Sequence, residues 1–273
     1  MTNEQYVQEL NMWRASMNEG LTKENGWLAL SGLFWLHDGE NKVGTAVSNH
    51  VTLPSNSAPA EVGTFTLHDG QVTLAVTAVD QVQVDGKPSN EVILQPDTTD
   101  APSFVTINNL RMVVIQRGEQ FGIRLWDNDR PERQTFNGRK WHPPQEKFRV
   151  TATYVPFDTP ETITFSRSLG ADFESEIQGY VNFSIDGIDY QLHTFAQPDG
   201  ELFTLFKDGS SGKTTYGAGR YLLTEKVINN QVIIDFNRVF NPPCAYTSYA
   251  TCTLPPRQNW LPIAIDAGEL SPK

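Results

Sequence analysis

The chain has 273 residues and a formal net charge of −11, and 38% of its residues are hydrophobic. This hydrophobic content is too high for a disordered chain and is enough for a sizeable buried core. The overall acidity argues against nucleic acid and anionic membranes as partners, because both bind cationic surfaces.

The sequence also bears on location. No run approaches the roughly 18 apolar residues that a membrane-spanning helix needs. The first ten residues carry Glu4 and Glu9 and lack the basic and apolar regions of a signal peptide. We therefore expect a cytoplasmic protein with no membrane partner.

Residues 2–20 are predicted to form an amphipathic helix. Thr2 and Gln5 match a capping box, and Gly20 stands where a helix would stop. Large apolar side chains recur on one face, at Tyr6, Leu10, Trp13 and Met17. This face predicts that the helix docks on the rest of the protein.

From residue 26 onward the pattern changes to short strands. Asp-Gly and Asn-Gly pairs, which favour tight hairpins, occur at 25–26, 38–39, 69–70, 85–86, 137–138, 186–187, 199–200 and 208–209. Hairpins are expected at 65–74 and 181–192. Further strands are expected at 105–107, 112–115, 122–126, 148–154, 162–165, 202–206 and 232–236.

These elements predict a mainly β fold, an antiparallel β sandwich or barrel of about a dozen or more short strands with one N-terminal helix. A parallel sheet would need crossover helices, which the pattern lacks. We expect a single continuous domain over 1–273, with the β body at 26–273 and a possible seam near 127–144.

Positive charge gathers in the middle of the chain. Residues 111–149 hold 9 Lys and Arg against 5 Asp and Glu. Guanidinium groups recognise carboxylates and phosphates by two-pronged hydrogen bonds, so this segment is a candidate for a small anionic ligand. Arg124, Arg139 and His142 are the candidate contacts. Arg130 and Arg133 are better explained as a solvated loop neutralised by neighbouring acids.

Polar residues crowd into the stretch 208–252. It contains 208–222 (DGSSGKTTYGAGRYL), 235–238 (DFNR), 241–246 (NPPCAY), 249–252 (YATC) and 254–256 (LPP), and 267–269 (AGE) follows it. With 32–36 (GLFWL) and the turn at 117–118, these motifs resemble the bacterial and archaeal family known as domain of unknown function 1684. Thr253 and Trp260 depart from the family pattern, which has proline and arginine there. The resemblance implies one continuous domain and no particular reaction.

Two charged residues lie at the ends of runs that are predicted to be buried strands, which indicates a polar cluster. Arg220 and Asp235 adjoin the strongly apolar runs 221–223 and 232–234. A buried charge survives only when it is paired, so we expect Arg220 to pair with Asp208 or Asp235.

Three hypotheses follow for this cluster. It is an enzyme site, a binding site without turnover, or a structural network that locks a proline-rich crossing in place. In the enzyme hypothesis Asp208 or Asp235 acts as base and Tyr216 as hydrogen-bond donor or acid. The candidate ligand contacts from this stretch are Ser210, Ser211, Thr214, Arg220, Asn237, Asn241 and Cys244.

Other chemistries fit less well. The run 209–214 suggests a phosphate-binding loop, but Lys207 replaces the first glycine and no helix opening follows. A serine nucleophile at Ser210 or Ser211 would need a distant histidine, His142 or His193, and the Gly-x-Ser-x-Gly elbow is missing. The scattered histidines and two cysteines give no metal-ligand spacing, so we expect no metal and no cofactor.

Cys244 and Cys252 are the only cysteines. Their spacing permits a local bridge, but a reducing cytoplasm favours two thiols. Cys244 is an alternative nucleophile, since thiols are activated beside cationic groups. The simpler interpretation is a small buried hydrophobic residue.

Overall fold

The computed structural model describes residues 3–272. The chain forms two compact units, unit 1 (residues 1–19 and 137–273) and unit 2 (residues 20–136). The second boundary falls inside 127–144, the segment predicted as a seam. The single-domain organisation stays a prediction.

The N-terminal helix is confirmed as α1, Asn3–Thr22. Leu10 is fully buried, and Tyr6, Trp13 and Met17 are half-buried, so the predicted apolar face is the packed face. The predicted cap at Thr2 lies outside the described residues. The predicted stop at Gly20 is wrong: the helix runs two residues further, and Leu21 is buried. A glycine costs a helix only about 1 kcal/mol, which packing readily offsets.

Unit 2 is built from two sheets. The six-stranded sheet has the order β1-β11-β10-β9-β6-β7 and the five-stranded sheet β3-β2-β4-β5-β8. The strands of the first are β1 (Leu30–Trp35), β6 (Val82–Val84), β7 (Lys87–Pro88), β9 (Phe104–Ile107), β10 (Leu110–Arg117) and β11 (Gln120–Asp127). Those of the second are β2 (Gly39–Gly44), β3 (Val51–Thr52), β4 (Gly63–His68), β5 (Gln71–Val76) and β8 (Glu91–Leu94). A short helix, α2 (Pro131–Gln134), follows β11.

Alternating side chains give unit 2 its core. In β4 every second residue is buried, and the same holds in β5 with the opposite phase, so one face of each strand is apolar. Buried residues of both sheets, such as Phe65, Leu74, Met112 and Ile123, belong to one hydrophobic cluster. Two sheets with a shared core form the predicted sandwich. The pairing is antiparallel except between β2 and the two-residue β3.

The predicted turn chemistry holds at three of the Asp-Gly pairs. Asp69, Asp85 and Asp186 have φ of 47°, 51° and 52°, and the following glycines also have positive φ. Two successive positive φ angles match the twist of a tight hairpin. Asp208 is different. Its side chain accepts a hydrogen bond from the backbone N of Ser210 instead.

Unit 1 contains one six-stranded sheet of order β16-β15-β14-β13-β12-β17. Its strands are β12 (Arg149–Phe165), β13 (Phe173–Ile185), β14 (Ile188–Ala196), β15 (Leu202–Phe206), β16 (Arg220–Leu223) and β17 (Gln231–Asp235). The strands predicted at 148–154 and 162–165 are one strand with an irregular register between Pro156 and Glu161. Pro156 and Pro160 lack the N–H that a regular ladder needs. Phe148 itself lies in the short 3₁₀ helix η1 (Glu146–Phe148).

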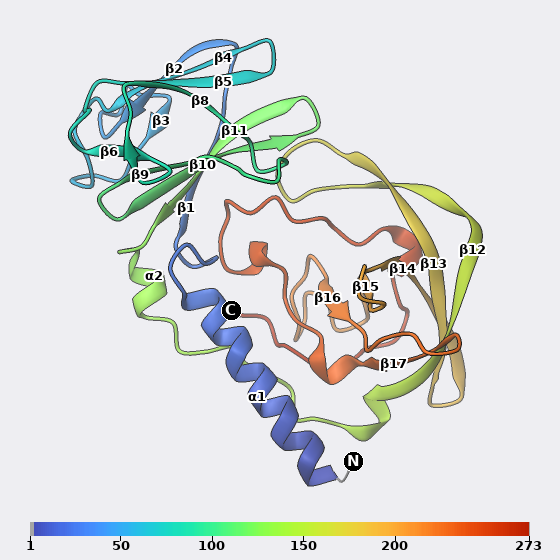
Figure 1. The fold of residues 1–273 in the computed structure, drawn as a ribbon. Coiled ribbons are helices and arrows are strands. Elements are labelled where there is room, and N and C mark those ends of the chain that lie inside the picture. The colour runs from blue at the N-terminus through green and yellow to red at the C-terminus, as the bar shows by residue number, and fades with distance from the viewer. Residues whose placement is uncertain (1–2, 273) are drawn as a thin grey trace. The chain divides into compact units, whose positions relative to one another are not determined.

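The C-terminal segment (residues 236–272), which follows β17, packs against the sheet of unit 1. Leu261, Ile265 and Ala267 belong to the same buried cluster as Val181, Leu192 and other strand residues. Figure 1 shows this segment, orange to red, running along the inner side of the curved strands β12 to β14. Its 3₁₀ helices are η2 (Phe236–Arg238), η3 (Pro243–Ala245) and η4 (Arg257–Asn259). Leu222, Phe236 and Val239, from the polar stretch 208–252, belong to this cluster too.

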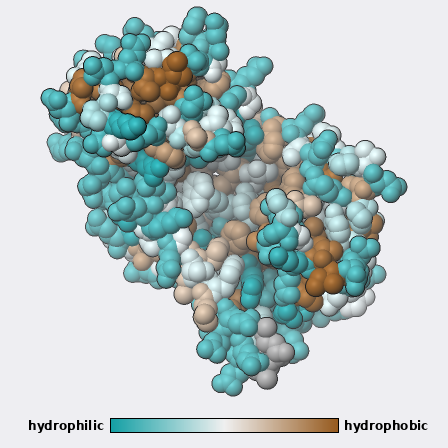
Figure 2. Space-filling model, in the orientation of Figure 1, coloured by the Kyte–Doolittle hydropathy of each residue, from teal (hydrophilic) through white to brown (hydrophobic). Residues whose placement is uncertain are grey.

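The visible surface is mostly hydrophilic, with hydrophobic groups in small patches (Figure 2). The large hydrophobic residues with the greatest exposure are Val47 at 95% and Met12 and Ile228 at 68%. Single exposed hydrophobic side chains are ordinary in soluble proteins. No helix among residues 3–272 is long and apolar enough to cross a membrane.

Candidate functional site

Arg220 pairs with Asp208, as the sequence predicted. Its Nη2 lies 2.7 Å from Asp208 Oδ2, and neither side chain is exposed. The guanidinium also donates to the carbonyl oxygens of Ala267 (2.5 Å) and Ile265 (2.9 Å). Burial lowers the pKa of Arg220, and the carboxylate of Asp208 opposes that shift. This geometry ties β16 to the C-terminal segment, which favours a structural role for the pair.

The loop after β15 closes around the same carboxylate. Asp208 Oδ1 accepts from the backbone N (2.6 Å) and the hydroxyl (2.5 Å) of Ser210, whose Oγ also lies 2.8 Å from Thr215 Oγ1. The hydroxyl of Ser211 accepts from the backbone N of Asp208 at 3.1 Å. Thr214 is exposed. The two serines are thus bound within their own loop, without a histidine in these contacts.

Asp235 belongs to a different set of contacts. The hydroxyl of Tyr6, on α1, donates to both its carboxylate oxygens at 3.0 and 2.9 Å. The backbone N of Asn237 donates to Oδ1 at 3.0 Å, and Arg238 Nε lies 3.7 Å from Oδ2. The side chain of Asn237 binds the backbone of Gln145. Sequence reasoning missed Tyr6, which appeared only as part of an apolar face.

A second buried ion pair joins Arg139 to Glu269. Arg139 Nη1 lies 2.5 Å from Glu269 Oε2, and their side chains are 6% and 1% exposed. The same oxygen accepts from the backbone N of Asn241 at 2.8 Å, and the Asn241 amide donates to Leu270 O. Glu269 Oε1 and Asn241 Oδ1 are buried without a hydrogen-bond partner among the described residues.

Glu269 therefore lies in an unusual environment for a carboxylate. Burial raises its pKa to about 7, although Arg139 and the hydrogen bonds from Asn241 work in the opposite direction. Glu269 belongs to the 267–269 motif, for which the sequence predicts no role. Its isolation from water could be found only from the fold.

Arg139 and His142 lie beside α1. The backbone N of Arg139 donates to Asn18 Oδ1 at 2.9 Å, and the guanidinium of Arg14 donates to the carbonyl of His142 at 3.1 Å. The backbone N of His142 donates to Gly268 O at 2.9 Å. Burial, followed by the charge of Arg220, lowers the pKa of His142. These contacts hold the helix against the C-terminal segment.

Tyr216 and Cys244 link two of the polar motifs, 208–222 and 241–246. The Tyr216 hydroxyl, from the loop before β16, donates to the carbonyl of Cys244 at 2.9 Å. Cys244 is half-buried in η3, and the backbone N of Cys244 donates to Cys252 Sγ at 3.1 Å. The two cysteines are not joined by a disulfide in this structure, and the two thiols expected in solution stay a prediction. Ser168 completes the group, donating to Ala250 O at 2.6 Å.

The two thiols differ in acidity. A hydrogen bond from the Cys252 thiol, assisted by the hydroxyls of Tyr216 and Ser168, lowers the pKa of Cys244 to about 7. The hydrogen bond to Cys244 and burial raise the pKa of Cys252. Burial, then Cys244, raises the pKa of Tyr216, which stays protonated at neutral pH. Cys244 is thus the more acidic of the two thiols.

Arg124 belongs to β11 of unit 2. Its guanidinium lies 4.0 Å from Asp97 Oδ2 and 5.8 Å from the ring of Trp27. Asp97 is held more closely by Arg117, at 2.8 Å. Arg124 is buried beside this pair. Its predicted ligand role stays a prediction.

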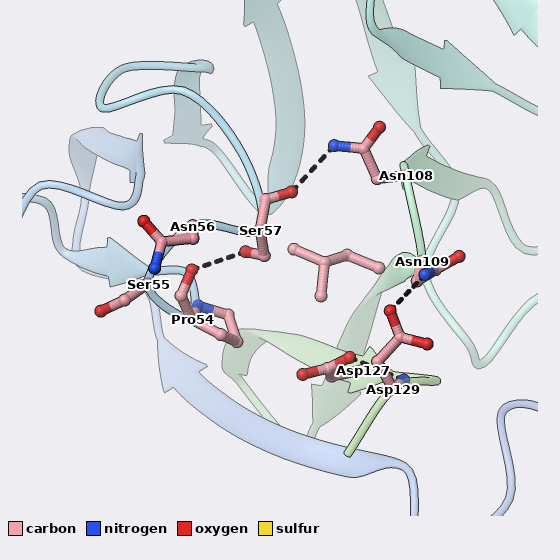
Figure 3. A pocket seen from close by; sticks show the side chains of 9 residues that line it. Pro54, Ser55, Asn56, Ser57, Asn108, Asn109, Asp127 and Asp129 are labelled. Carbon is pink, nitrogen blue, oxygen red and sulfur yellow. Dashed lines mark hydrogen bonds between the residues drawn. The ribbon is translucent and has the colours of Figure 1, made fainter.

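Unit 2 also contains a polar cavity of about 360 Å³ (Figure 3). Its lining residues are Pro54, Ser55, Asn56, Ser57, Asn108, Asn109, Leu110, Asp127 and Asp129. Several of these polar groups bind one another: the Asn108 amide donates to Ser57 O at 2.9 Å, and the Asn109 amide donates to Asp129. Such a lining offers few free groups for a ligand.

Metal-ligand geometry is absent from residues 3–272, where no three His, Cys, Asp or Glu side chains gather in a way that could hold an ion. The expectation of no metal and no cofactor stays a prediction.

Comparison with solved structures gives partial matches. An uncharacterised protein of Haloarcula marismortui, solved by NMR, is 31% identical, with 51% of this chain and 79% of that chain covered and a TM-score of 0.42. An FHA domain studied for phosphothreonine-dependent interactions is 14% identical (34% and 92% covered, TM-score 0.25). The FHA-2 domain of a Mycobacterium tuberculosis ABC transporter is 19% identical (33% and 77% covered, TM-score 0.25). No curated protein matches the chain.

A family match covers the part of the chain that holds the site. Residues 134–270 match the family described as "Protein of unknown function (DUF1684)". The match includes the loop before β16 and the cysteine segment, and it does not extend to the motifs at 32–36 and 117–118 that also suggested the resemblance. The chain belongs to the DUF1684 family of proteins of unknown function.

Proposed function

We propose that unit 1 is an enzyme acting on a small molecule, with Cys244 as nucleophile and Tyr216 as proton donor. The observation that carries this proposal is the hydrogen bond from the Tyr216 hydroxyl to the carbonyl oxygen of Cys244 at 2.9 Å, which joins two separate polar motifs. The nearby Cys252 thiol, with the hydroxyls of Tyr216 and Ser168, lowers the pKa of the Cys244 thiol. A lowered pKa favours the thiolate, which is the reactive form of cysteine.

A small activated acyl compound, an ester or thioester, is the substrate class that this chemistry favours. The Cys244 thiolate adds to the carbonyl carbon, and the new S–C bond replaces the bond to the leaving group. Tyr216 gives its proton to the departing oxygen or sulfur. Water then hydrolyses the acyl-cysteine and returns a proton to Tyr216, which restores both groups and releases the acid.

The anionic character of the ligand stays a prediction. Of the arginines suggested for an anion, Arg220 and Arg139 are each paired with a carboxylate. A cytoplasmic location is part of the proposal. A reducing compartment would keep the unbridged Cys244 and Cys252 as thiols. For Asp208 and Arg220 we infer the structural role, because neither side chain is exposed.

The nucleophile is tested by the pH dependence of alkylation. We expect iodoacetamide to modify Cys244 in the native protein with a midpoint near pH 7, as the lowered pKa of about 7 requires. Tyr216→Phe should raise this midpoint, because the Tyr216 hydroxyl is one of the groups that lower the pKa of Cys244. Tyr190→Phe, in the same unit but packed on Phe183, is the matched control and should leave it in place. A midpoint at the ordinary value of a cysteine, or faster labelling of Cys252, would contradict the assignment.

Acyl transfer is tested with p-nitrophenyl acetate. Mass spectrometry after acid quench should locate an acetyl group on Cys244, and nitrophenol release should exceed one equivalent per chain. Cys244→Ser should show neither. If alkylation has a low midpoint but no acyl adduct forms, Cys244 is a reactive thiol and the proposed acyl transfer is wrong.

A further inference from the structure

The two cysteines of unit 1 form a pair, although only one is needed as a nucleophile. Cys252 Sγ accepts a hydrogen bond from the backbone N of Cys244 at 3.1 Å. The thiol of Cys244 is only a few bonds from this backbone N, and a hydrogen bond between the two thiols lowers the pKa of Cys244. The sulfur atoms are therefore neighbours while both are reduced.

The backbone holds Cys252 in place. Its N–H donates to Ser168 Oγ at 2.9 Å, and its carbonyl accepts from the backbone N of Ser168 at 2.8 Å. Cys244 lies in the short helix η3, where the backbone N of Ala245 donates to Pro242 O at 3.0 Å. Adjacent prolines stiffen this segment. Because Cys252 Sγ already lies 3.1 Å from the backbone N of Cys244, the two sulfur atoms are held near each other.

The pair also differs in access. Cys244 is half-buried, whereas Cys252 is 7% exposed. The lowered pKa of Cys244 and the raised pKa of Cys252 follow the same division. An oxidant therefore reacts first with the thiolate of Cys244, while the neighbouring Cys252 remains a protonated thiol. A low-pKa, accessible cysteine next to a second thiol is the arrangement of a reversible oxidation site.

We propose that Cys244 and Cys252 form a reversible disulfide when a hydroperoxide oxidises Cys244. The Cys244 thiolate attacks the peroxide O–O bond, gaining a hydroxyl as a sulfenic acid and releasing an alkoxide, which takes a proton. Cys252 then loses its proton, and its sulfur displaces the hydroxyl from Cys244 as water. The pair loses two electrons, the hydroperoxide gains them, and a small dithiol restores both thiols by exchange.

This site shares Cys244 with the proposed function but does not require acyl transfer. Both cysteines lie in the single tryptic peptide 239–257, between Arg238 and Arg257. A bridge within this peptide lowers its mass by two hydrogens without joining it to another peptide. The full-length protein is treated with an equivalent of hydrogen peroxide, alkylated under denaturing, non-reducing conditions and digested.

In the wild type we expect most of peptide 239–257 to resist alkylation, to have lost two hydrogens, and to recover both thiols after dithiothreitol. Cys252→Ser should instead retain a sulfenic acid on Cys244 that dimedone traps. Cys244→Ser should leave Cys252 as a thiol. Two alkylated thiols in treated wild type, irreversible oxidation of Cys244 alone, or disulfide-linked dimers would overturn the proposal. A bridge without an acetyl adduct would overturn only the acyl-transfer function.

Discussion

The two buried ion pairs of unit 1, Arg220–Asp208 and Arg139–Glu269, differ mainly in the hydrogen bonds that their carboxylates accept. Asp208 has both oxygens occupied, one by Arg220 and the other by Ser210. Glu269 has one oxygen bound by Arg139 and Asn241, and its other oxygen has no partner among residues 3–272. Burial alone does not predict how a charge behaves. The number of donors that replace its water decides whether the charge is kept.

The two carboxylates therefore have different surroundings, and burial raises the pKa of Glu269 to about 7. The Asp208–Arg220 pair ties a strand to the C-terminal segment through the carbonyls of Ala267 and Ile265. The Arg139–Glu269 pair joins the segment around Arg139 to the same C-terminal segment. One of its carboxylate oxygens, Glu269 Oε1, accepts no hydrogen bond from the described residues. Variants of each pair should therefore respond differently to mutation and to pH.

Loss of the first pair should have the largest effect. Arg220→Ala should lower the free energy of unfolding by ~3–5 kcal/mol, because it leaves a buried carboxylate without its counterion. Urea denaturation measures this change. Arg238→Ala is the control, since Arg238 is 32% exposed and lies 3.7 Å from its carboxylate, and its effect should be clearly smaller. An unchanged stability of Arg220→Ala would point to an open ligand site instead of a structural pair.

Glu269 should make stability depend on pH. Its pKa rises from 4.5 to about 7 on folding, which corresponds to ~3 kcal/mol. The folded protein holds this proton more tightly than the unfolded chain. The contribution is therefore fully present below pH 4.5, is lost as pH rises toward 7, and is then constant.

Glu269→Gln should remove this part of the pH profile, because glutamine does not titrate. Denaturation of both proteins between pH 4.5 and 8 gives the difference directly. If the wild type and the variant lose stability in parallel over this range, Glu269 keeps an ordinary pKa and the contrast with Asp208 fails.

A surface pair should have the smallest effect. Arg149 Nη2 lies 2.7 Å from Glu225 Oε1, with side chains 34% and 52% exposed. Water screens such a pair, so Glu225→Gln should change the free energy of unfolding by less than about 1 kcal/mol, and by less again in high salt. A loss comparable to that of Arg220→Ala would show that distance between the charges, and not burial, sets the ranking.

Local patterns predicted much of the fold. Alternating apolar residues and Asp-Gly pairs identified the hairpins at β4–β5 and β13–β14, and helix periodicity identified α1. These signals lie within a few residues of one another, so a single sequence carries them. Errors arose where packing overrode a local signal, at Gly20, or where a bulge joined two predicted strands, in β12.

The sequence by itself determined that Arg220 needs a buried partner, because charged groups beside strongly apolar runs cannot stay unpaired. It left open whether that partner is Asp208 or Asp235. Only the tertiary structure decided this, by placing Tyr6 of α1 against Asp235 and Arg220 against Asp208. The isolation of Glu269 and the contact of Tyr216 with Cys244 were decided in the same way. They join residues far apart in the chain, and hydrogen-bond satisfaction depends on neighbours that no local pattern specifies.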